Sequence, residues 1–172
     1  MTSSDLQQLY QQIILDHAKA RHGYTTDPPA DLVAADGSRT ASSHQVNTTC
    51  GDEVTVHVSV GATPAGDGPV EAGRIEAGRI ETLAWHGDGC SISMASASVL
   101  SDTVRGLPAS EATALLGAFR DMLRSRGTIE PDEEQLGDAA AFAGVSRYPA
   151  RVKCAMLPWV AFEEALLRAA AL

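Results

Sequence analysis

The sequence has little positive charge and no long apolar run. Its 172 residues include 13 lysines and arginines against 22 aspartates and glutamates, a formal net charge of −9. Neutralising nucleic-acid phosphates requires clustered Lys and Arg, so this deficit argues against a nucleic-acid partner and favours a protein or a small molecule. No apolar stretch is long enough for a signal-peptide core or a membrane span, so we expect a cytoplasmic protein without a membrane partner.

Cysteine is also scarce, because only Cys50, Cys90 and Cys154 are present. An odd number of cysteines without an export signal does not suit a disulfide framework, whereas reduced cytosolic thiols are free to bind metal or to react. With 172 residues, of which 44% are hydrophobic, the chain is long enough for one domain with a real core and short for two. We therefore expect one domain over residues 1–172.

The three cysteines stand beside residues that are typical of turns. Cys50 is followed by Gly51 and Asp52, and Cys90 follows a Gly-Asp-Gly segment. Three thiols and the carboxylate of Asp52 supply the four ligands of a tetrahedral Zn²⁺ site. Two simpler interpretations compete: free cysteines often pack as small hydrophobic residues, and Asp after Gly is an ordinary turn residue. Because none of the cysteines lies in an aliphatic stripe, we favour the metal site, with Cys50, Asp52, Cys90 and Cys154 as ligands.

The alternating valines from Val54 to Val60 predict a half-buried strand, with His57 on its solvated face. A shorter strand over residues 42–48 and another over residues 80–86 complete a predicted antiparallel meander. In such a meander the loop between the first two strands and the exit from the third lie at the same end of the sheet. This topology is expected to bring Cys50, Asp52 and Cys90 together.

Residues 61–78 are rich in Gly, Ala and Pro and carry most of a tandem five-residue repeat over residues 71–75 and 76–80. A repeat this short does not indicate a solenoid and is better explained by a local duplication in a tolerant loop. We interpret it as a hairpin-loop insertion at the opposite end of the sheet from the cysteines, and we assign it no chemistry.

Helical spacing of apolar residues predicts a first helix that begins at a capping box over residues 4–7 and runs to about Ala20. His17 continues the apolar stripe, so it is interpreted as a packed histidine. His22 follows five residues later, which on a continuous helix places it off the face of His17 and argues against a metal-binding pair. A packed or capping role for His17 is therefore favoured over a ligand.

Further helices are predicted after Cys90, after Pro108, after Pro131 and at the C-terminal end of the chain. Proline is favoured only in the first turn of a helix, so Pro158 predicts that the last helix begins close to Cys154. Cys90 and Cys154 would then both lie near positive helix ends, which favour the thiolate. The expected fold is α+β, a small three-stranded antiparallel sheet packed against several helices.

Three thiolates and one carboxylate around Zn²⁺ leave a formal charge of about −2 on the site. Such an excess requires nearby cations, and Arg147, Arg151 and Lys153 are the basic residues closest to Cys154 in the sequence. We expect Arg151 and Lys153 to supply supporting charge.

The motifs around the cysteines resemble those of the U-type iron–sulfur assembly proteins, the IscU/NifU-N-like family, and within it the SufU branch. The resemblance covers most of the chain and implies a fold of the SufE/NifU/IscU type. One departure is Thr48, which stands where members of the family commonly have Pro. The matching residues are Leu9, Tyr10, Asp16 and His17; Asn47, Cys50, Gly51 and Asp52; Gly87, Gly89, Cys90, Ser93, Ala95, Ser96 and Ser98; and Arg151, Lys153, Cys154, Leu157 and Trp159.

Two features of the sequence favour the SufU branch over the IscU scaffolds. Lys153 stands where scaffolds carry a histidine, and residues 106–144 leave room for the extra helical segment of SufU-type proteins. The resemblance implies a zinc-dependent sulfurtransferase that acts with a SufS-type pyridoxal-phosphate cysteine desulfurase, and a downstream Suf scaffold as receiver. Cys50 would be the catalytic sulfur acceptor, and Asp52, Cys90 and Cys154 would hold the zinc.

Two other functions remain open at this point. An iron–sulfur scaffold of the IscU type would use the same ligands to hold a cluster. A zinc-stapled interaction domain would use them only for stability, in which case no cysteine would be reactive.

Overall fold

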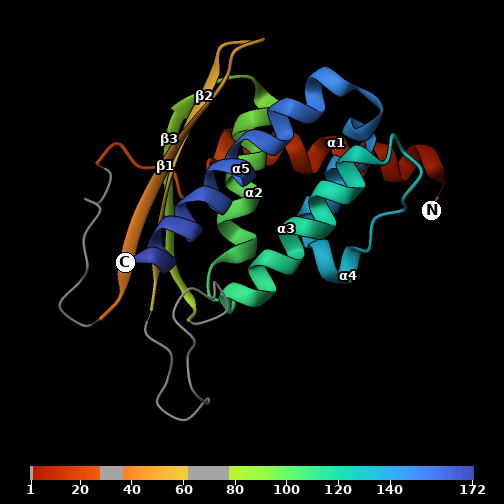
Figure 1. Ribbon diagram of the computed structural model, residues 1–172. Helices are drawn as coiled ribbons and strands as arrows, with labels where there is room; N and C mark the ends of the chain where they lie inside the picture. The colour runs from red at the N-terminus through yellow and green to blue at the C-terminus, as the bar shows by residue number, and fades with distance from the viewer. Residues whose placement is uncertain (1, 28–36, 62–77) are drawn as a thin grey trace.

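The structure, a computed structural model, describes residues 2–27, 37–61 and 78–172. A sheet of three strands lies on one side of the molecule and the helices pack on the other (Figure 1). This is the α+β architecture expected from the sequence. In chain order the elements are α1 Ser3–Ala20, β1 Arg39–Asn47, β2 Asp52–Val60, β3 Ile80–Asp88, α2 Ser91–Val104, α3 Ala109–Arg124, α4 Glu133–Leu136, the 3₁₀ helix η1 Gly137–Arg147 and α5 Pro149–Ala171.

The sheet is the predicted antiparallel meander, with the order β1-β2-β3. Asn47 pairs with Asp52 at the β1–β2 turn, and Glu53 pairs with Asp88 at the end of β3. The β1–β2 turn and the exit from β3 therefore lie at the same end of the sheet, at the top of Figure 1. The predicted insertion falls mostly on residues 62–77, which lie outside the described residues.

Two details of the sheet differ from expectation. β1 is as long as its neighbours, because it pairs with β2 along its whole length from Arg39 to Asn47. His57, expected to be solvated, is only 7% exposed. Its ring stacks on the ring of His86 with the centroids 5.3 Å apart, so a diagonal neighbour on β3 covers it.

The core lies between the sheet and the helices. The four valines of β2 from Val54 to Val60 are buried, and α5 packs against both β1 and β2. The apolar residues expected to face inward from the last helix, Trp159, Phe162, Leu166 and Ala169, are all buried. Among the described residues, none of the helices combines the length and the apolar character that a membrane crossing requires.

Helix α1 begins earlier than predicted, and the chain turns back sharply after its end. Its capping box is formed by Thr2 and Asp5, two residues before the predicted position. It ends at Ala20 as expected, where Arg21 adopts a left-handed conformation and donates its backbone N–H to the His17 carbonyl. The chain therefore turns back before His22, whose ring centroid lies 5.3 Å from that of His17. The expectation that His22 points away from His17 was wrong because the helix does not continue to residue 22.

Helix α5 begins at Pro149, five residues before Cys154, and Pro158 lies in its interior. The prediction that Pro158 marks the first turn was therefore wrong. An interior proline costs about 3 kcal/mol. Helix α5 tolerates this cost because it buries large apolar side chains such as Trp159 and Phe162, each stabilising by roughly 1.5–3 kcal/mol. Pro149 fits the first turn well, because its missing N–H has no helical partner there.

Gly87 allows β3 to pair closely with β2 beside the cysteines. Its φ is +151°, and a Cβ at this position would lie 2.2 Å from the carbonyl oxygen of Glu53. We expect Gly87→Ala to lower the free energy of unfolding by roughly 1–3 kcal/mol, measured by urea denaturation. The control is Gly117→Ala in α3, where a Cβ meets nothing within 4 Å and helix propensity predicts a gain of about 0.5–1 kcal/mol. Unchanged stability of Gly87→Ala would contradict the close approach of the two strands.

Candidate metal centre

Three different elements place the cysteines around one cleft. Cys50 lies in the turn between β1 and β2, Cys90 is the N-cap of α2 directly after β3, and Cys154 lies in the second turn of α5. The cleft has a volume of about 470 Å³, and all three cysteines line it. Cys50 and Cys90 are exposed, whereas Cys154 is buried. The thiols therefore differ in how freely a partner molecule can reach them.

The distances between donor atoms fit a tetrahedral metal shell. The Sγ atoms of Cys50 and Cys154 lie 3.9 Å apart. Two ligands of a tetrahedral Zn²⁺ with Zn–S bonds near 2.3 Å are separated by about 3.8 Å. A carboxylate oxygen of Asp52 completes a group with these two thiols in which all donor atoms lie within 4.8 Å of one another. Soft sulfur and hard oxygen donors in this arrangement suit Zn²⁺.

Cys90 is the one predicted ligand outside this tight group. Its Sγ lies 3.5 Å from the Ser93 hydroxyl, and its backbone N–H donates to Asp52 Oδ1 at 3.1 Å. The thiol nevertheless lines the same cleft and interacts with the thiol of Cys154. Cys90 is therefore the predicted fourth donor that lies beside the group without belonging to it.

Asp52 is held in place by the start of α2. It is 5% exposed, and its two oxygens accept hydrogen bonds from the Cys90 backbone N–H and, at 2.6 Å, from the Ser93 hydroxyl. Burial alone would raise the pKa of the Asp52 carboxyl. The hydrogen bonds from Ser93, Cys90 and Cys50 outweigh burial and hold the pKa below its ordinary value. Asp52 is thus a carboxylate near neutral pH, in the form that a metal binds.

The environment of Cys154 differs from the sequence-based expectation. Because α5 begins at Pro149, the thiol does not lie in the first turn of the helix, where the dipole is strongest. Burial, followed by the neighbouring Cys90 thiol, raises the pKa of the Cys154 thiol well above its ordinary value. Cys154 is therefore a neutral thiol in the metal-free protein, and a bound cation would have to displace its proton.

Two polar residues that the sequence reasoning gave no role also shape the site. Asn47, only 8% exposed, points its Nδ2 at the Cys154 Sγ at 3.9 Å and accepts the backbone N–H of Thr49 at 3.1 Å. Ser93 is fully buried and binds Asp52. A hydroxyl three residues after a helix N-cap was the available signal for Ser93, whereas the role of Asn47 depends on contacts between distant elements.

The predicted supporting charges are unequal. Arg151 lines the cleft, with its guanidinium carbon 5.3 Å from the centre of the Tyr148 ring. Lys153 is exposed and does not line the cleft, and Arg147 packs instead against Gly127 after α3. Arg151 is therefore the predicted cation that the structure places beside the thiols.

Comparison with known proteins agrees with this geometry. Residues 9–155 match the family described as the NifU-like N terminal domain. The chain is 33% identical over 170 residues to the "Iron-sulfur cluster assembly scaffold protein IscU" of Streptococcus pyogenes serotype M1, covering 99% of this chain and 90% of the relative. It is 32% identical over 166 residues to the "Zinc-dependent sulfurtransferase SufU" of Bacillus subtilis, covering 96% of this chain and 95% of the relative.

A solved structure supports the same grouping. The crystal structure of a proposed iron–sulfur cluster assembly scaffold protein for the SUF system of Fervidobacterium islandicum AW-1 superposes with a TM-score of 0.64 and 28% identity. The superposition covers 96% of this chain and 99% of that one. Fold, cysteine geometry and sequence thus lead to one family, and the chain belongs to the NifU-like N-terminal domain family, the IscU/NifU-N-like group that includes the SufU type.

Proposed function

We propose that this chain serves iron–sulfur cluster assembly as a zinc-dependent sulfur acceptor, taking persulfide sulfur from a SufS-type cysteine desulfurase. The difference in exposure between the thiols of Cys50 and Cys154 supports this role most directly. Cys50 is exposed on a turn, and its neighbour Cys154, 3.9 Å away, is buried within a helix. Of this pair, Cys50 is therefore the thiol that a partner protein can reach. Cys90 is also exposed, but its backbone N–H is tied to Asp52.

Asp52, Cys90 and Cys154 would hold the Zn²⁺ together with Cys50. When bound, the metal keeps the thiols deprotonated and shielded from oxidation. The turn between β1 and β2 lets Cys50 move, whereas the Cys90 backbone is tied to Asp52 by its N–H. Arg151, which lines the cleft, offsets part of the negative charge of the thiolates.

In the transfer step the Cys50 thiolate attacks the outer sulfur of the desulfurase persulfide. A new S–S bond forms on Cys50 while the old S–S bond breaks, and the desulfurase cysteine leaves as a thiolate. No net oxidation or reduction takes place, because one sulfane sulfur passes between two cysteines. A downstream Suf scaffold would receive this sulfur. A cytoplasmic location fits the reaction, because thiols are kept reduced there.

Scaffolding is the second candidate function, favoured by the scaffold names of the Streptococcus and Fervidobacterium relatives. One experiment separates the two. The zinc-loaded protein is mixed with a SufS-type desulfurase and free cysteine, and alanine formation and persulfide on the accepting chain are measured. Sulfur acceptance predicts a large rise in desulfurase turnover and a persulfide on this chain.

The same protein is then stripped of metal and reconstituted with iron and sulfide. If it holds a stable cluster that it passes to an apo-protein, while the desulfurase turnover is unaffected by its addition, the scaffold function replaces the one proposed.

A further inference from the structure

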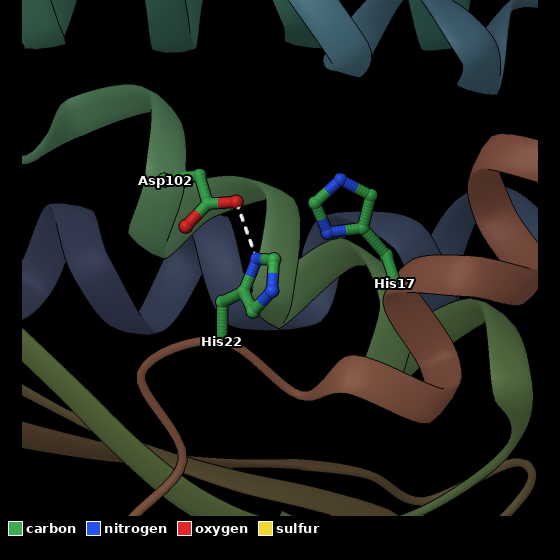
Figure 2. Close-up of side chains that lie close together, drawn as sticks. All are labelled: His17, His22 and Asp102. Carbon is green, nitrogen blue, oxygen red and sulfur yellow. Dashed lines mark hydrogen bonds and ion pairs between the residues drawn. The ribbon is translucent and has the colours of Figure 1, made fainter.

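A second group of potential metal ligands lies at the other end of α2. His17 comes from the last turn of α1, His22 from the segment that follows it, and Asp102 from the end of α2 (Figure 2). Their ligand atoms all lie within 4.8 Å of one another. Asp102 is twelve residues beyond Cys90 on the same helix, or about 18 Å along its axis, so this group is separate from the cysteine cleft.

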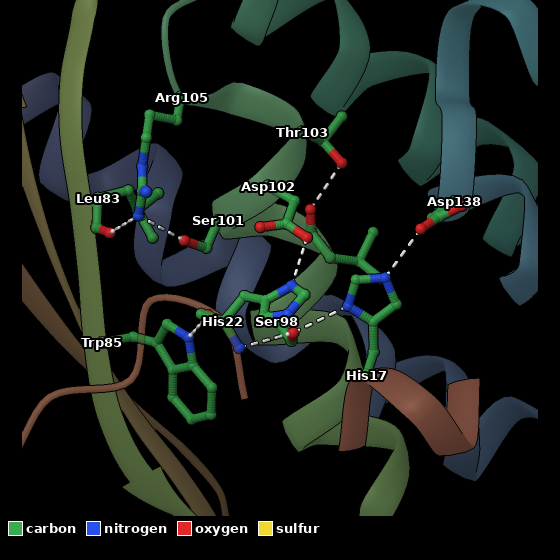
Figure 3. Close-up of polar contacts among 11 residues, drawn as sticks. His17, His22, Leu83, Trp85, Ser98, Ser101, Asp102, Thr103, Arg105 and Asp138 are labelled. Carbon is green, nitrogen blue, oxygen red and sulfur yellow. Dashed lines mark hydrogen bonds and ion pairs between the residues drawn. The ribbon is translucent and has the colours of Figure 1, made fainter. Parts of the chain in front are cut away.

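His17 is oriented as metal-binding histidines usually are. Its Nε2 lies 2.9 Å from Asp138 Oδ2, and its Nδ1 lies 2.8 Å from the Ser98 hydroxyl (Figure 3). The Asp138 carboxylate can only accept, so Nε2 carries the proton of the neutral imidazole and donates to it. Nδ1 then accepts the Ser98 hydroxyl, whose oxygen also accepts the backbone N–H of His22 at 2.9 Å. A carboxylate on the outer nitrogen fixes the ring and raises the basicity of the inner one.

His22 and Asp102 leave the group open to solvent. His22 Nδ1 lies 2.5 Å from Asp102 Oδ2, and the two side chains are 50% and 46% exposed. His17, in contrast, is 6% exposed. The group therefore combines the buried, oriented imidazole of His17 with two side chains at the surface. Solvent reaches the group from the side of His22 and Asp102.

The local charge favours a cation. Asp102 and Asp138 both face the histidines, and Arg105 is directed away from them (Figure 3). Arg105 donates to the Leu83 carbonyl and the Ser101 hydroxyl, and the guanidinium of Arg21 lies over the Tyr24 ring. Among the described residues, the ion pairs of both carboxylates are with histidines and not with an arginine.

We propose that His17 Nδ1, one ring nitrogen of His22 and the carboxylate of Asp102 bind a divalent first-row transition cation, for which Zn²⁺ is the probe. Two imidazoles and one carboxylate suit these ions rather than Ca²⁺ or Mg²⁺, which prefer oxygen ligands only. Water completes the shell at the exposed side.

Binding requires a small contraction of the group. Ligands of a tetrahedral Zn²⁺ with bonds near 2.0–2.1 Å are about 3.3 Å apart, less than the present limit of 4.8 Å. His22 and Asp102 can supply the movement because they are half exposed, and the Ser98 hydroxyl gives up the Nδ1 lone pair. The ion would then join the C-terminal ends of α1 and α2.

The test follows histidine ring nitrogens by NMR in ¹⁵N-labelled protein whose cysteine site has first been saturated with Zn²⁺. We expect one further equivalent of Zn²⁺ to shift the ring signals of His17 and His22 together. Both His22→Gln and Asp102→Asn should weaken this binding at least about tenfold. Because the reporters are histidines, the result does not depend on what the cysteines bind.

His44→Gln is the matched control. His44 is also an exposed histidine beside a carboxylate, with its Nε2 3.8 Å from Glu53 Oε2, but among the described residues it is not part of a group of three ligands. The His44→Gln substitution should leave the Zn²⁺ affinity unchanged. If the histidine signals of the parent protein do not respond to the added Zn²⁺, or if His22→Gln binds as tightly as His44→Gln, the proposed site does not exist.

Discussion

Replacing Cys50 with alanine is expected to abolish sulfur acceptance. Cys50→Ala removes the exposed thiol of the cleft turn, while Asp52 keeps its hydrogen bonds to Cys90 and Ser93. The desulfurase should then turn over no faster with the variant than alone, and mass spectrometry should find no persulfide on the chain. The remaining three ligands should still retain Zn²⁺, although more weakly, because a three-ligand site leaves one position open to water.

Thr49→Ala is the control for the Cys50 variant. Thr49 lines the same cleft on the same turn, and the turn is held by its backbone N–H to Asn47 rather than by its hydroxyl. The Thr49→Ala variant should therefore accept sulfur like the parent protein. A persulfide that appears on Cys90 or Cys154 of Cys50→Ala, with turnover still raised, would move the acceptor role to another cysteine.

Local patterns predicted those features of the fold that depend on local physics. The alternation from Val54 to Val60 reflects a strand with one buried face, and the meander follows from short connections between successive strands. The register that pairs Asn47 with Asp52 places Cys50 in a tight turn, at the end of the sheet where β3 leads into Cys90. The neighbourhood of Cys50, Asp52 and Cys90 was therefore predictable from connectivity alone.

Features that depend on tertiary packing were not predictable in this way. The rule that proline starts a helix failed at Pro158. The burial of apolar side chains on α5 outweighs the cost of an interior proline, and this burial cannot be seen from the local sequence. The helical-wheel argument failed at His22, because it assumed a helix beyond Ala20. The hydrogen bond between Ser93 and Asp52 joins a helix to a strand, and the position of the Ser93 hydroxyl after the N-cap does not reveal its partner. Contacts between distant elements decided the outcome at Pro158 and Ser93, and the left-handed turn at Arg21 decided it at His22.

Trp159→Ala is expected to cause a large loss of stability. Trp159 is fully buried, and its ring stacks on Phe119 with the centroids 4.3 Å apart. Its Nε1–H donates to the Ser96 hydroxyl at 3.0 Å, and that hydroxyl donates to the Ala155 carbonyl at 2.5 Å. The substitution leaves a cavity and removes this hydrogen bond, so the free energy of unfolding should fall by about 3–5 kcal/mol in urea denaturation. The whole free energy of unfolding of a native protein is only about 5–15 kcal/mol, so this loss is a large share of it.

The control is Leu167→Ala on the same helix, where the side chain is 48% exposed and the expected change is within about 0.5 kcal/mol. A loss below about 1 kcal/mol for Trp159→Ala would mean that the core closes around the missing ring. Trp159 and Ser96 join α5 to α2, and these two helices carry Cys154 and Cys90. The same substitution should therefore also weaken Zn²⁺ binding in the fraction that remains folded, because the spacing between the two thiols depends on how closely the helices pack.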